Sequence, residues 1–274
     1  MKVSLIIAVY DDVGALDLIM SALRHQTYGN FEVVVAEDGE SPAVRDYVGS
    51  IRGLDVRHTT QEDRGIRKAR SLNNGIIAGS GDYLVFLDGD CVPYSTFLEY
   101  HVRLAEPRQV LTGRRVNLGP RYSEKLRKHE ITSLQLEKTF LVRWPLIALD
   151  ARERHSENGI TFTPGGRLYR LLIKNQRNTS LLGCNFSCFR ETMFAVNGYD
   201  EAYGETSYAD DTDLEWRFKA IGMELRSCKN VANIFHLYHS RSHRKHINED
   251  EARKRYEENR RNRLFECRQG IKQH

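Results

Sequence analysis

Three apolar runs in the first third of the chain each end in acidic side chains, and this pattern limits the folds that the chain can adopt. The runs are short and rich in β-branched residues, and they cover residues 3–9, 31–36 and 83–87. The segments between them carry apolar residues at helical spacing, over residues 14–26, 42–52 and 62–82. Residues 55–59 are expected to form a further short strand. Strands that alternate with helices through short connections predict right-handed βαβ units. The predicted fold class is therefore α/β, with a Rossmann-like, mostly parallel central sheet flanked by helices.

Acidic pairs follow three of the predicted strands. They are Asp11 and Asp12, Glu37 and Asp38, and Asp88 and Asp90. Parallel sheets bind ligands at the carboxyl ends of their strands, so these side chains are expected to converge. Asp88 and Asp90 flank Gly89, which lets the backbone approach a ligand without a Cβ. Such carboxylates are suitable ligands for Mg²⁺ or Mn²⁺, although Asp-Gly-Asp alone is also compatible with a solvated turn.

The usual glycine-rich phosphate-binding motifs are missing from the sequence. No GxGxxG follows the first strand, and no GxxxxGK[ST] occurs, which disfavours a dinucleotide-binding fold and a P-loop ATPase. A bound diphosphate would instead need a metal ion and basic side chains. The segment 62–82 supplies four of these, namely Arg64, Arg67, Lys68 and Arg70. Their alternative interpretation is a solvated helix face.

Length, charge and cysteine usage set broader limits. The 274 residues suffice for one large α/β domain with an appendage. The net charge of +4 is small and dispersed, which does not suggest nucleic acid as a partner. Five cysteines without dense spacing predict free thiols in a reducing compartment and no zinc site. No apolar run reaches the roughly 18 residues needed to span a membrane. We expect a cytoplasmic protein, with peripheral contact at the inner membrane face left open.

The rest of the chain is less regular. We expect a helix at 93–106, a strand at 110–116, helical stretches within 121–150, an Asp-rich helix start at 210–222 and a strand at 230–239. The polar residues 150–179 are expected to form a loop or insertion. The charged tail, 241–274, is expected to contain a helix at 249–267. This helix is either solvated or in contact with anionic lipid head groups, and its interspersed acids disfavour nucleic acid.

Five segments, in order along residues 3–240, resemble family-2 glycosyltransferases with the GT-A fold. They are VSLIIAVYDD, FEVVVAEDGE, DRGIRKARSLNNGIIAGSGDYLVFLDGDC, GCNFSCFRETMFAVNGYDE and YADDTDLEWRFKAIG. The similarity is greatest to the galactosyltransferase and chondroitin-polymerase branch. It implies a GT-A domain over 1–240, with a nucleotide-sugar-binding half at 1–117 and an acceptor-binding, catalytic half at 118–240. A basic helical tail, 241–274, would follow.

The resemblance implies roles for individual residues. Asp38 would accept a hydrogen bond from the nucleobase, most simply from uracil N3–H, and Tyr10 would stack near the base. Asp90 would be the principal metal ligand, and Asp88 would face the ribose or the metal. Further contacts to the nucleotide sugar would come from Asp11, Arg64, Lys68, Arg70, Asn73 and Gly89.

The catalytic and acceptor-side roles are implied in the same way. Asp211 would be the general base, and Asn185 and Asp210 would line the acceptor side. Relatives often use a late histidine as a further metal ligand. Because residues three apart on a strand point to opposite faces, only one of His236 and His239 is expected to reach the site, and His236 is favoured.

Together these roles describe an inverting, Mn²⁺- or Mg²⁺-dependent glycosyltransferase. It would move a sugar from a nucleotide sugar, most simply a UDP-sugar, to a saccharide or lipid-linked saccharide in polysaccharide or glycoconjugate biosynthesis. The usual Glu of the catalytic motif is Asp210 here, which leaves the sugar specificity open. A nucleotidyltransferase is an alternative, but it would need a glycine-rich, lysine-containing loop after the first strand. A non-catalytic sugar-nucleotide-binding protein is another, against which the retained Asp90 and Asp211 argue.

Overall fold

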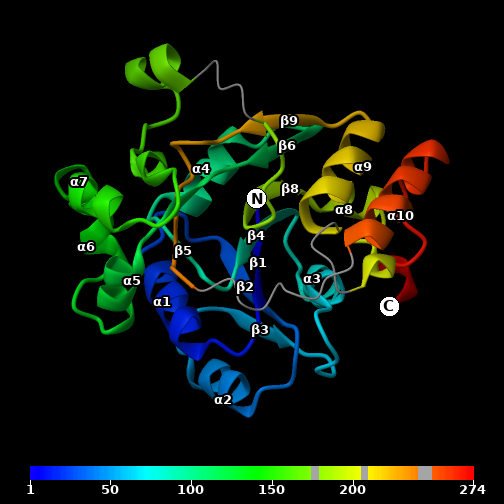
Figure 1. Cartoon of the computed structure of the whole chain (residues 1–274), viewed down its shortest axis with the longest axis horizontal. Coiled ribbons are helices and arrows are strands. Elements are labelled where there is room, and N and C mark those ends of the chain that lie inside the picture. The colour runs from blue at the N-terminus through cyan, green and yellow to red at the C-terminus, as the bar shows by residue number, and fades with distance from the viewer. Residues whose placement is uncertain (174–178, 205–208, 240–248) are drawn as a thin grey trace.

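The computed structural model describes residues 1–173, 179–204, 209–239 and 249–274 of the chain (Figure 1). Its centre is a seven-stranded sheet in the order β3-β2-β1-β4-β8-β6-β9. The strands are β1 (Val3–Val9), β2 (Phe31–Glu37), β3 (Val56–Thr59), β4 (Tyr83–Asp88), β6 (Gln109–Thr112), β8 (Asn185–Phe189) and β9 (Glu224–Ser227). All neighbours pair in parallel except β8, which is antiparallel to β4 and β6. The predicted mostly parallel α/β fold is confirmed.

The register of the parallel strands brings their acidic ends together. Val9 at the end of β1 is opposite Glu37 of β2, and Ala8 is opposite Asp88 of β4. The three acidic pairs that follow these strands therefore leave the sheet at one edge, as the sequence predicts.

Helices cover both faces of the sheet. Alternate residues of a central strand therefore pack against different helices on the two sides. The helices are α1 (Val13–Leu23), α2 (Pro42–Ser50), α3 (Lys68–Ala78), α4 (Phe97–Leu104), α5 (Pro120–Arg127), α6 (Ser133–Lys138), α7 (Phe140–Asp150), α8 (Arg190–Ala195), α9 (Leu214–Ala220) and α10 (Glu249–Arg261). Leu5 and Ile7 belong to one apolar cluster with α1 and α4, whereas Ile6 belongs to a second with α3, α8 and α9. Figure 1 shows α1 and α2 well separated from the group formed by α3, α8, α9 and α10.

A second, three-stranded sheet was not predicted. It has the order β5-β10-β7, with β5 at Cys91–Pro93, β10 at Ile234–His236 and β7 at Arg115–Asn117. The single strand predicted at 110–116 is wrong, because the chain leaves β6 in the large sheet and enters β7 in the small one. It crosses at Gly113, where a Cβ would lie 2.2 Å from Asn185 Nδ2. Of the strand predicted at 230–239, only β10 at Ile234–His236 is present.

Several predicted helices have different limits. The helix predicted at 62–82 begins only at Lys68, so Arg64 lies in the preceding loop and Arg67 is the N-cap. The helix predicted from residue 93 begins at Phe97, after β5. The helical region 121–150 is divided into α5, α6 and α7.

The predicted loop region at 150–179 is partly integrated into the domain. It contains a short 3₁₀ turn at Ser156–Gly159 and a π-helical turn at Tyr169–Ile173. Asn158 is buried, and its Nδ2 donates to the carbonyl oxygen of Arg115 in β7 at 3.0 Å. Residues 174–178 lie outside the described part of the chain.

The C-terminal residues are also part of the folded body. Ala252 of α10 and Ile271 are buried in the second apolar cluster. The predicted helical tail therefore packs against the domain over its described residues. The five cysteines are buried free thiols, as predicted. Among the described helices, none combines the length and the apolar character needed to cross a bilayer.

Candidate active site

A cavity of about 130 Å³ lies where the carboxyl end of β4 meets the small sheet. Its walls are mainly polar, and they comprise Asp88, Asp90, Arg115, Asn117, Leu118, Glu153, His236, Tyr238 and His239. The carboxyl end of β4 thus contributes two carboxylates, and the small sheet contributes Arg115, Asn117 and His236.

The Asp90 carboxylate is in contact with two imidazoles. Its Oδ2 is 3.3 Å from His236 Nε2 and 3.2 Å from His239 Nε2, and its Oδ1 accepts from Cys91 Sγ at 3.2 Å. Burial raises the pKa of Asp90, but hydrogen bonds from the two imidazoles outweigh it and hold this pKa well below its ordinary value. Asp90 is therefore ionised at neutral pH.

The prediction that only one of the two histidines reaches the site is wrong. It assumed an extended strand through both residues, but β10 ends at His236. The backbone N–H of Leu237 donates to the carbonyl oxygen of Asp90 at 2.9 Å. The chain thus stays beside Asp90 after the strand ends. His239 is not part of the strand, so the alternation of faces does not apply to it, and it contacts the carboxylate.

Asp90, His236 and His239 are a suitable set of metal ligands. Their ligand atoms all lie within 4.8 Å of one another. One carboxylate and two imidazoles on one side leave room for ligand oxygens on the other. The set therefore suits a divalent cation that accepts nitrogen as well as oxygen ligands.

Asp88 lines the same cavity but has a different partner. Its Oδ1 is 2.8 Å from Nζ of Lys68, the first residue of α3, and both side chains are about a quarter exposed. Between the two acids, a Cβ on Gly89 would lie 2.6 Å from the carbonyl oxygen of Ala8. Only glycine lets the chain pass so close to β1 while it presents a carboxylate on either side.

Asp38 and Tyr10 lie at the neighbouring strand ends. Asp38 Oδ1 accepts from Gln61 Nε2 and its Oδ2 from the backbone N–H of Arg67, each at 2.7 Å. Burial raises the pKa of Asp38 and these hydrogen bonds offset it only in part. Tyr10 is 63% exposed, so its ring face is available for stacking. Asp11 accepts from Ser41 Oγ at 2.7 Å.

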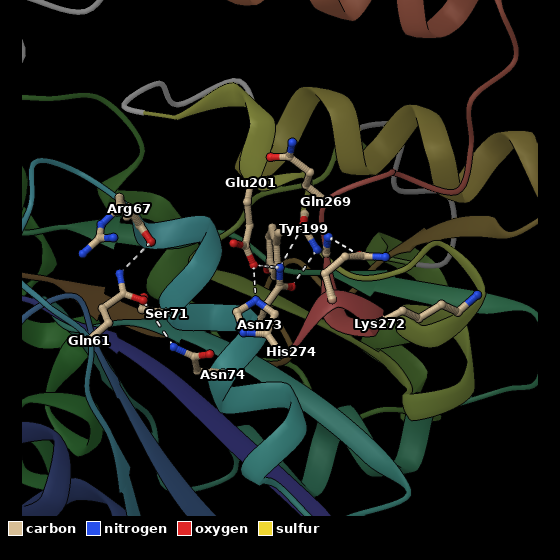
Figure 2. Close-up of polar contacts among 12 residues, drawn as sticks. Gln61, Arg67, Ser71, Asn73, Asn74, Tyr199, Glu201, Gln269, Lys272 and His274 are labelled. Atoms are coloured by element: carbon tan, nitrogen blue, oxygen red, sulfur yellow. Dashed lines mark hydrogen bonds and ion pairs between the residues drawn. The ribbon is translucent and has the colours of Figure 1, made fainter.

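The remaining residues predicted to contact the nucleotide sugar divide into two groups. Arg64 and Arg70 are exposed, and neither forms an ion pair within the described ranges. Asn73 of α3 is buried instead, and Figure 2 shows its side chain directed toward Tyr199 and Glu201. Its Nδ2 donates to the carbonyl oxygen of Tyr199 at 2.9 Å and to Glu201 Oε1 at 2.8 Å. The predicted contact of Asn73 with the nucleotide sugar does not fit this position, because its amide group is already hydrogen-bonded to Tyr199 and Glu201.

Asp211 lies in a π-helical turn, Ala209–Asp213, directly before α9. Its Oδ1 accepts from the backbone N–H of Gly183 at 2.5 Å, and the side chain is half-buried. The side chain of Asp210 lies outside the described residues. Asp213 is a structural residue, because its Oδ2 pairs with buried Arg217 Nε at 2.6 Å.

The acceptor-side role predicted for Asn185 does not fit its environment. The residue is fully buried. Its Nδ2 donates to the carbonyl oxygens of Arg114 and Ala232 at 3.1 and 2.9 Å, and its Oδ1 is 3.1 Å from His101 Nε2. Asn185 of β8 therefore links the large sheet to the segments that lead into β7 and β10, and its buried amide is not accessible to an acceptor.

Five cavity residues were missed from the sequence: Arg115, Asn117, Leu118, Glu153 and Tyr238. Arg115 and Asn117 belong to the strand of the small sheet that was not predicted. Asn117 Nδ2 donates to Glu153 Oε2 at 3.2 Å, which brings the polar region after α7 to the cavity. The sequence does indicate His239, as the less favoured of two candidate histidine ligands.

The sequence matches two family models. The one for glycosyl transferase family 2 matches residues 4–189, which is more than half of the chain. The one for the N-terminal domain of galactosyltransferase matches residues 171–240. Together they extend across both sheets and the whole cavity.

Two curated relatives illustrate the range of similarity. Chondroitin synthase of Escherichia coli is 21% identical over 244 residues, which cover 83% of this chain and 34% of that protein. Validoxylamine A glucosyltransferase of Streptomyces hygroscopicus subsp. jinggangensis is 38% identical over 88 residues, which cover 31% of this chain and 21% of that protein. The matches thus span about a fifth to a third of the length of these relatives.

Solved structures with the same fold are more distant in sequence. GalNAc-T7 with UDP, GalNAc and Mn²⁺ has a TM-score of 0.61 at 12% identity, over 88% of this chain and 44% of that one. The mannosyltransferase PcManGT of Pyrobaculum calidifontis, in complex with GDP-Man and Mn²⁺, has a TM-score of 0.56 at 17% identity, over 88% of this chain and 58% of that one. These likenesses show the GT-A fold.

Proposed function

The chain belongs to glycosyl transferase family 2, and we propose that it transfers a sugar from a UDP-sugar to a hydroxyl group of a saccharide, with inversion at the anomeric carbon. The observation that carries the proposal is the cluster of Asp90, His236 and His239 beside the Asp88–Lys68 pair. A carboxylate–imidazole site next to a basic side chain suits the diphosphate of a nucleotide sugar. The distant structural likenesses named above include complexes with a nucleotide sugar or with UDP, together with Mn²⁺, and are consistent with this site.

The donor is held from two sides in this proposal. Asp90, His236 and His239 would hold Mn²⁺, which when bound offsets the negative charge of the leaving diphosphate. Lys68 adds a positive charge from the start of α3. Asp38 keeps lone pairs beyond its two hydrogen bonds and accepts from uracil N3–H, while the exposed ring of Tyr10 stacks near the base.

Proton transfer is assigned to Asp211. An acceptor hydroxyl is a weak nucleophile, so a carboxylate must take its proton as the oxygen attacks the anomeric carbon. The hydrogen bond from the Gly183 N–H fixes one carboxylate oxygen of Asp211 and so orients the group directly before α9. Attack from the face opposite the diphosphate inverts the anomeric centre without a covalent intermediate.

The acceptor is proposed to be a saccharide, free or lipid-linked, in polysaccharide or glycoconjugate biosynthesis. The similarity to chondroitin synthase over most of this chain supports this class. The polar lining of the cavity, which includes Glu153 and Asn117, also suits a hydroxyl-rich ligand.

Calorimetry with a set of nucleotide sugars, with and without Mn²⁺, tests the proposal. We expect UDP and UDP-sugars to bind more tightly in Mn²⁺ than GDP and GDP-sugars do, and saccharide acceptors to cause UDP release. Pyrophosphate release from UTP and a sugar phosphate would instead identify a nucleotidyltransferase. Binding without UDP release in any acceptor mixture would favour a non-catalytic protein.

A further inference from the structure

α7 exposes an apolar surface that no described part of the chain covers. Its sequence is FLVRWPLIALD, and only Phe140 and Ile147 are buried. The exposed side chains, here named the α7 face, are Leu141, Val142, Trp144, Leu146 and Leu149. Val142 and Leu149 are 86% and 84% exposed, so nearly their whole surface is in contact with solvent. Figure 1 places α7 at the edge of the molecule, on the opposite side from α10.

Such a surface is costly in water and indicates an interaction site. Burying it would remove several large aliphatic side chains and one indole from water. With 11 residues, α7 is too short to span a bilayer, which takes about 20. A helix of this kind is suited to lie in the interface of a membrane, where Trp and Leu side chains enter the head-group boundary.

The charges around the α7 face are asymmetric. The three acids nearest to α7 in the chain are engaged within the protein: Glu137 accepts from Ser95, Asp150 caps α5, and Glu153 contacts Asn117. Glu157, in the 3₁₀ turn beside α7, is exposed and lies next to His155. The bases at the two ends of α7, Lys138 before it and Arg152 and Arg154 after it, are exposed. An apolar face flanked by exposed cations is complementary to a bilayer surface that carries anionic lipids.

The α7 face is also directly connected to the cavity. Asp150, the last residue of α7, accepts from the backbone N–H groups of Arg121 and Tyr122 at 3.2 and 2.9 Å, which fixes α7 against α5. The chain then continues to Glu153 in the cavity wall, and Leu118 of that wall lies just before α5. A partner bound to the α7 face would therefore lie next to the cavity wall that contains Glu153 and Leu118.

We propose that α7 docks the protein on the surface of a membrane with anionic lipids, with the α7 face in the head-group boundary. Docking itself does not depend on the proposed function. Its consequence, that acceptors are taken from the membrane surface, rests on the proposed function.

Co-sedimentation with vesicles tests the docking. We expect the protein to bind vesicles of phosphatidylcholine with a minority of phosphatidylglycerol, and to bind pure phosphatidylcholine more weakly. Val142→Glu with Leu149→Glu places two charges on the α7 face without touching the core, and should weaken vesicle binding about tenfold or more. The control, Ile77→Glu, introduces one glutamate at an exposed apolar position of α3, away from the α7 face, and should bind like wild type. Each single α7 variant, Val142→Glu or Leu149→Glu, carries the same charge as this control and should bind more weakly than it.

Fluorescence gives a second, local measurement. The protein has two tryptophans, so Trp216→Phe leaves Trp144 as the only indole. Its emission should shift to shorter wavelength with anionic vesicles, because the indole enters a less polar environment. UDP binding in Mn²⁺, measured on the same samples, should be unchanged in the α7 double variant, which separates failure of docking from failure of the proposed function.

Three outcomes would overturn the docking proposal. One is wild-type protein that binds neither kind of vesicle. Another is a double variant that binds anionic vesicles as tightly as wild type. The third is a concentration-dependent dimer in sedimentation velocity that the double variant abolishes, together with no vesicle binding. This outcome would assign the α7 face to a second copy of this chain.

Discussion

At the scale of single residues, the site depends on a carboxylate that two imidazoles keep ionised. Asp90 is surrounded by His236 and His239, whose positive charge or N–H donation offsets the cost of its burial. Asp88 is neutralised separately by Lys68. The two neighbouring acids thus have separate partners, which reduces the repulsion between them.

Asp90→Asn tests the metal-binding role. The substitution keeps the shape but removes the charged ligand, so we expect UDP affinity in Mn²⁺ to fall at least about tenfold, to near its metal-free value. Calorimetric titration of UDP with and without Mn²⁺ measures this. The control, Asp46→Asn on the exposed side of α2, should retain the metal effect. Unchanged Mn²⁺ dependence in the Asp90 variant would exclude Asp90 as a ligand.

Asp211→Asn separates chemistry from binding. The amide oxygen can still accept from the Gly183 N–H, so the local structure should persist, but the side chain can no longer take a proton. We expect kcat to fall by about 10² to 10⁴-fold with UDP affinity within about twofold of wild type. Steady-state UDP release and calorimetry are the two measurements. Near-normal turnover would contradict the assignment of the base.

At the scale of elements, buried polar contacts hold the parallel half of the sheet together at the edge opposite the site. Glu32 of β2 accepts from Ser4 Oγ of β1 at 2.7 Å, from Lys2 Nζ at 2.9 Å and from the backbone N–H of Ser80. Burial raises the pKa of Glu32, but these hydrogen bonds outweigh it and lower the pKa to about 2. The residue joins two strands to the turn that follows α3.

Glu32→Gln should therefore destabilise the fold in a pH-dependent way. Because the folded pKa lies below the ordinary value of 4.5, the ionised carboxylate stabilises the fold above pH 4.5, and this contribution is lost as the pH falls toward 2. At neutral pH we expect the free energy of unfolding to fall by up to about 3 kcal/mol. Urea denaturation across this range should show the difference from wild type shrinking with pH.

The control for this prediction is Glu40→Gln, at an exposed position. It should change the free energy of unfolding by less than about 0.5 kcal/mol. A Glu32 variant as stable as wild type at neutral pH would show that the three hydrogen bonds contribute nothing net.

At the scale of the whole molecule, residues 271–274 pack on the side of α3. Ile271 lies against Gly198, and its backbone N–H donates to the carbonyl oxygen of Asn197 at 3.1 Å. His274 Nε2 is 2.5 Å from Glu201 Oε1, which also accepts from Asn73 of α3 (Figure 2). The last residues thus connect α3, which begins at Lys68 in the site, to the segment that leads toward Asp211.

Ile271→Ala tests whether the C-terminal segment is a structural part of the domain. The buried side chain leaves a cavity in the second apolar cluster, so we expect a loss of about 2 to 4 kcal/mol in the free energy of unfolding. Lys272→Ala, next to it but half-exposed and paired with Glu266, should lose less than about 1 kcal/mol. Thermal or urea unfolding measures both. Equal stability of the Ile271 variant and wild type would make the segment a dispensable tail.

The sequence alone determined the parallel half of the fold and the acids at its edge. Short connections and the periods of strand and helix are local properties, and they place β1, β2 and β4 side by side. Once these strands are parallel, Asp38, Asp88 and Asp90 must leave the sheet at the same edge. For this reason the position of the site could be predicted before any contact was known.

Only the tertiary structure decided how the cavity is closed. The small sheet joins β5, β7 and β10, which lie far apart in the chain, and no local pattern reports a pairing of that range. That pairing places Arg115 in the cavity wall and brings His239 to Asp90 after the strand has ended. It also leaves Asn185 of β8 buried, with its amide bonded to Arg114 and Ala232. Periodicity describes a residue's face within its own element. The partner that this face meets depends on the packing of the whole chain.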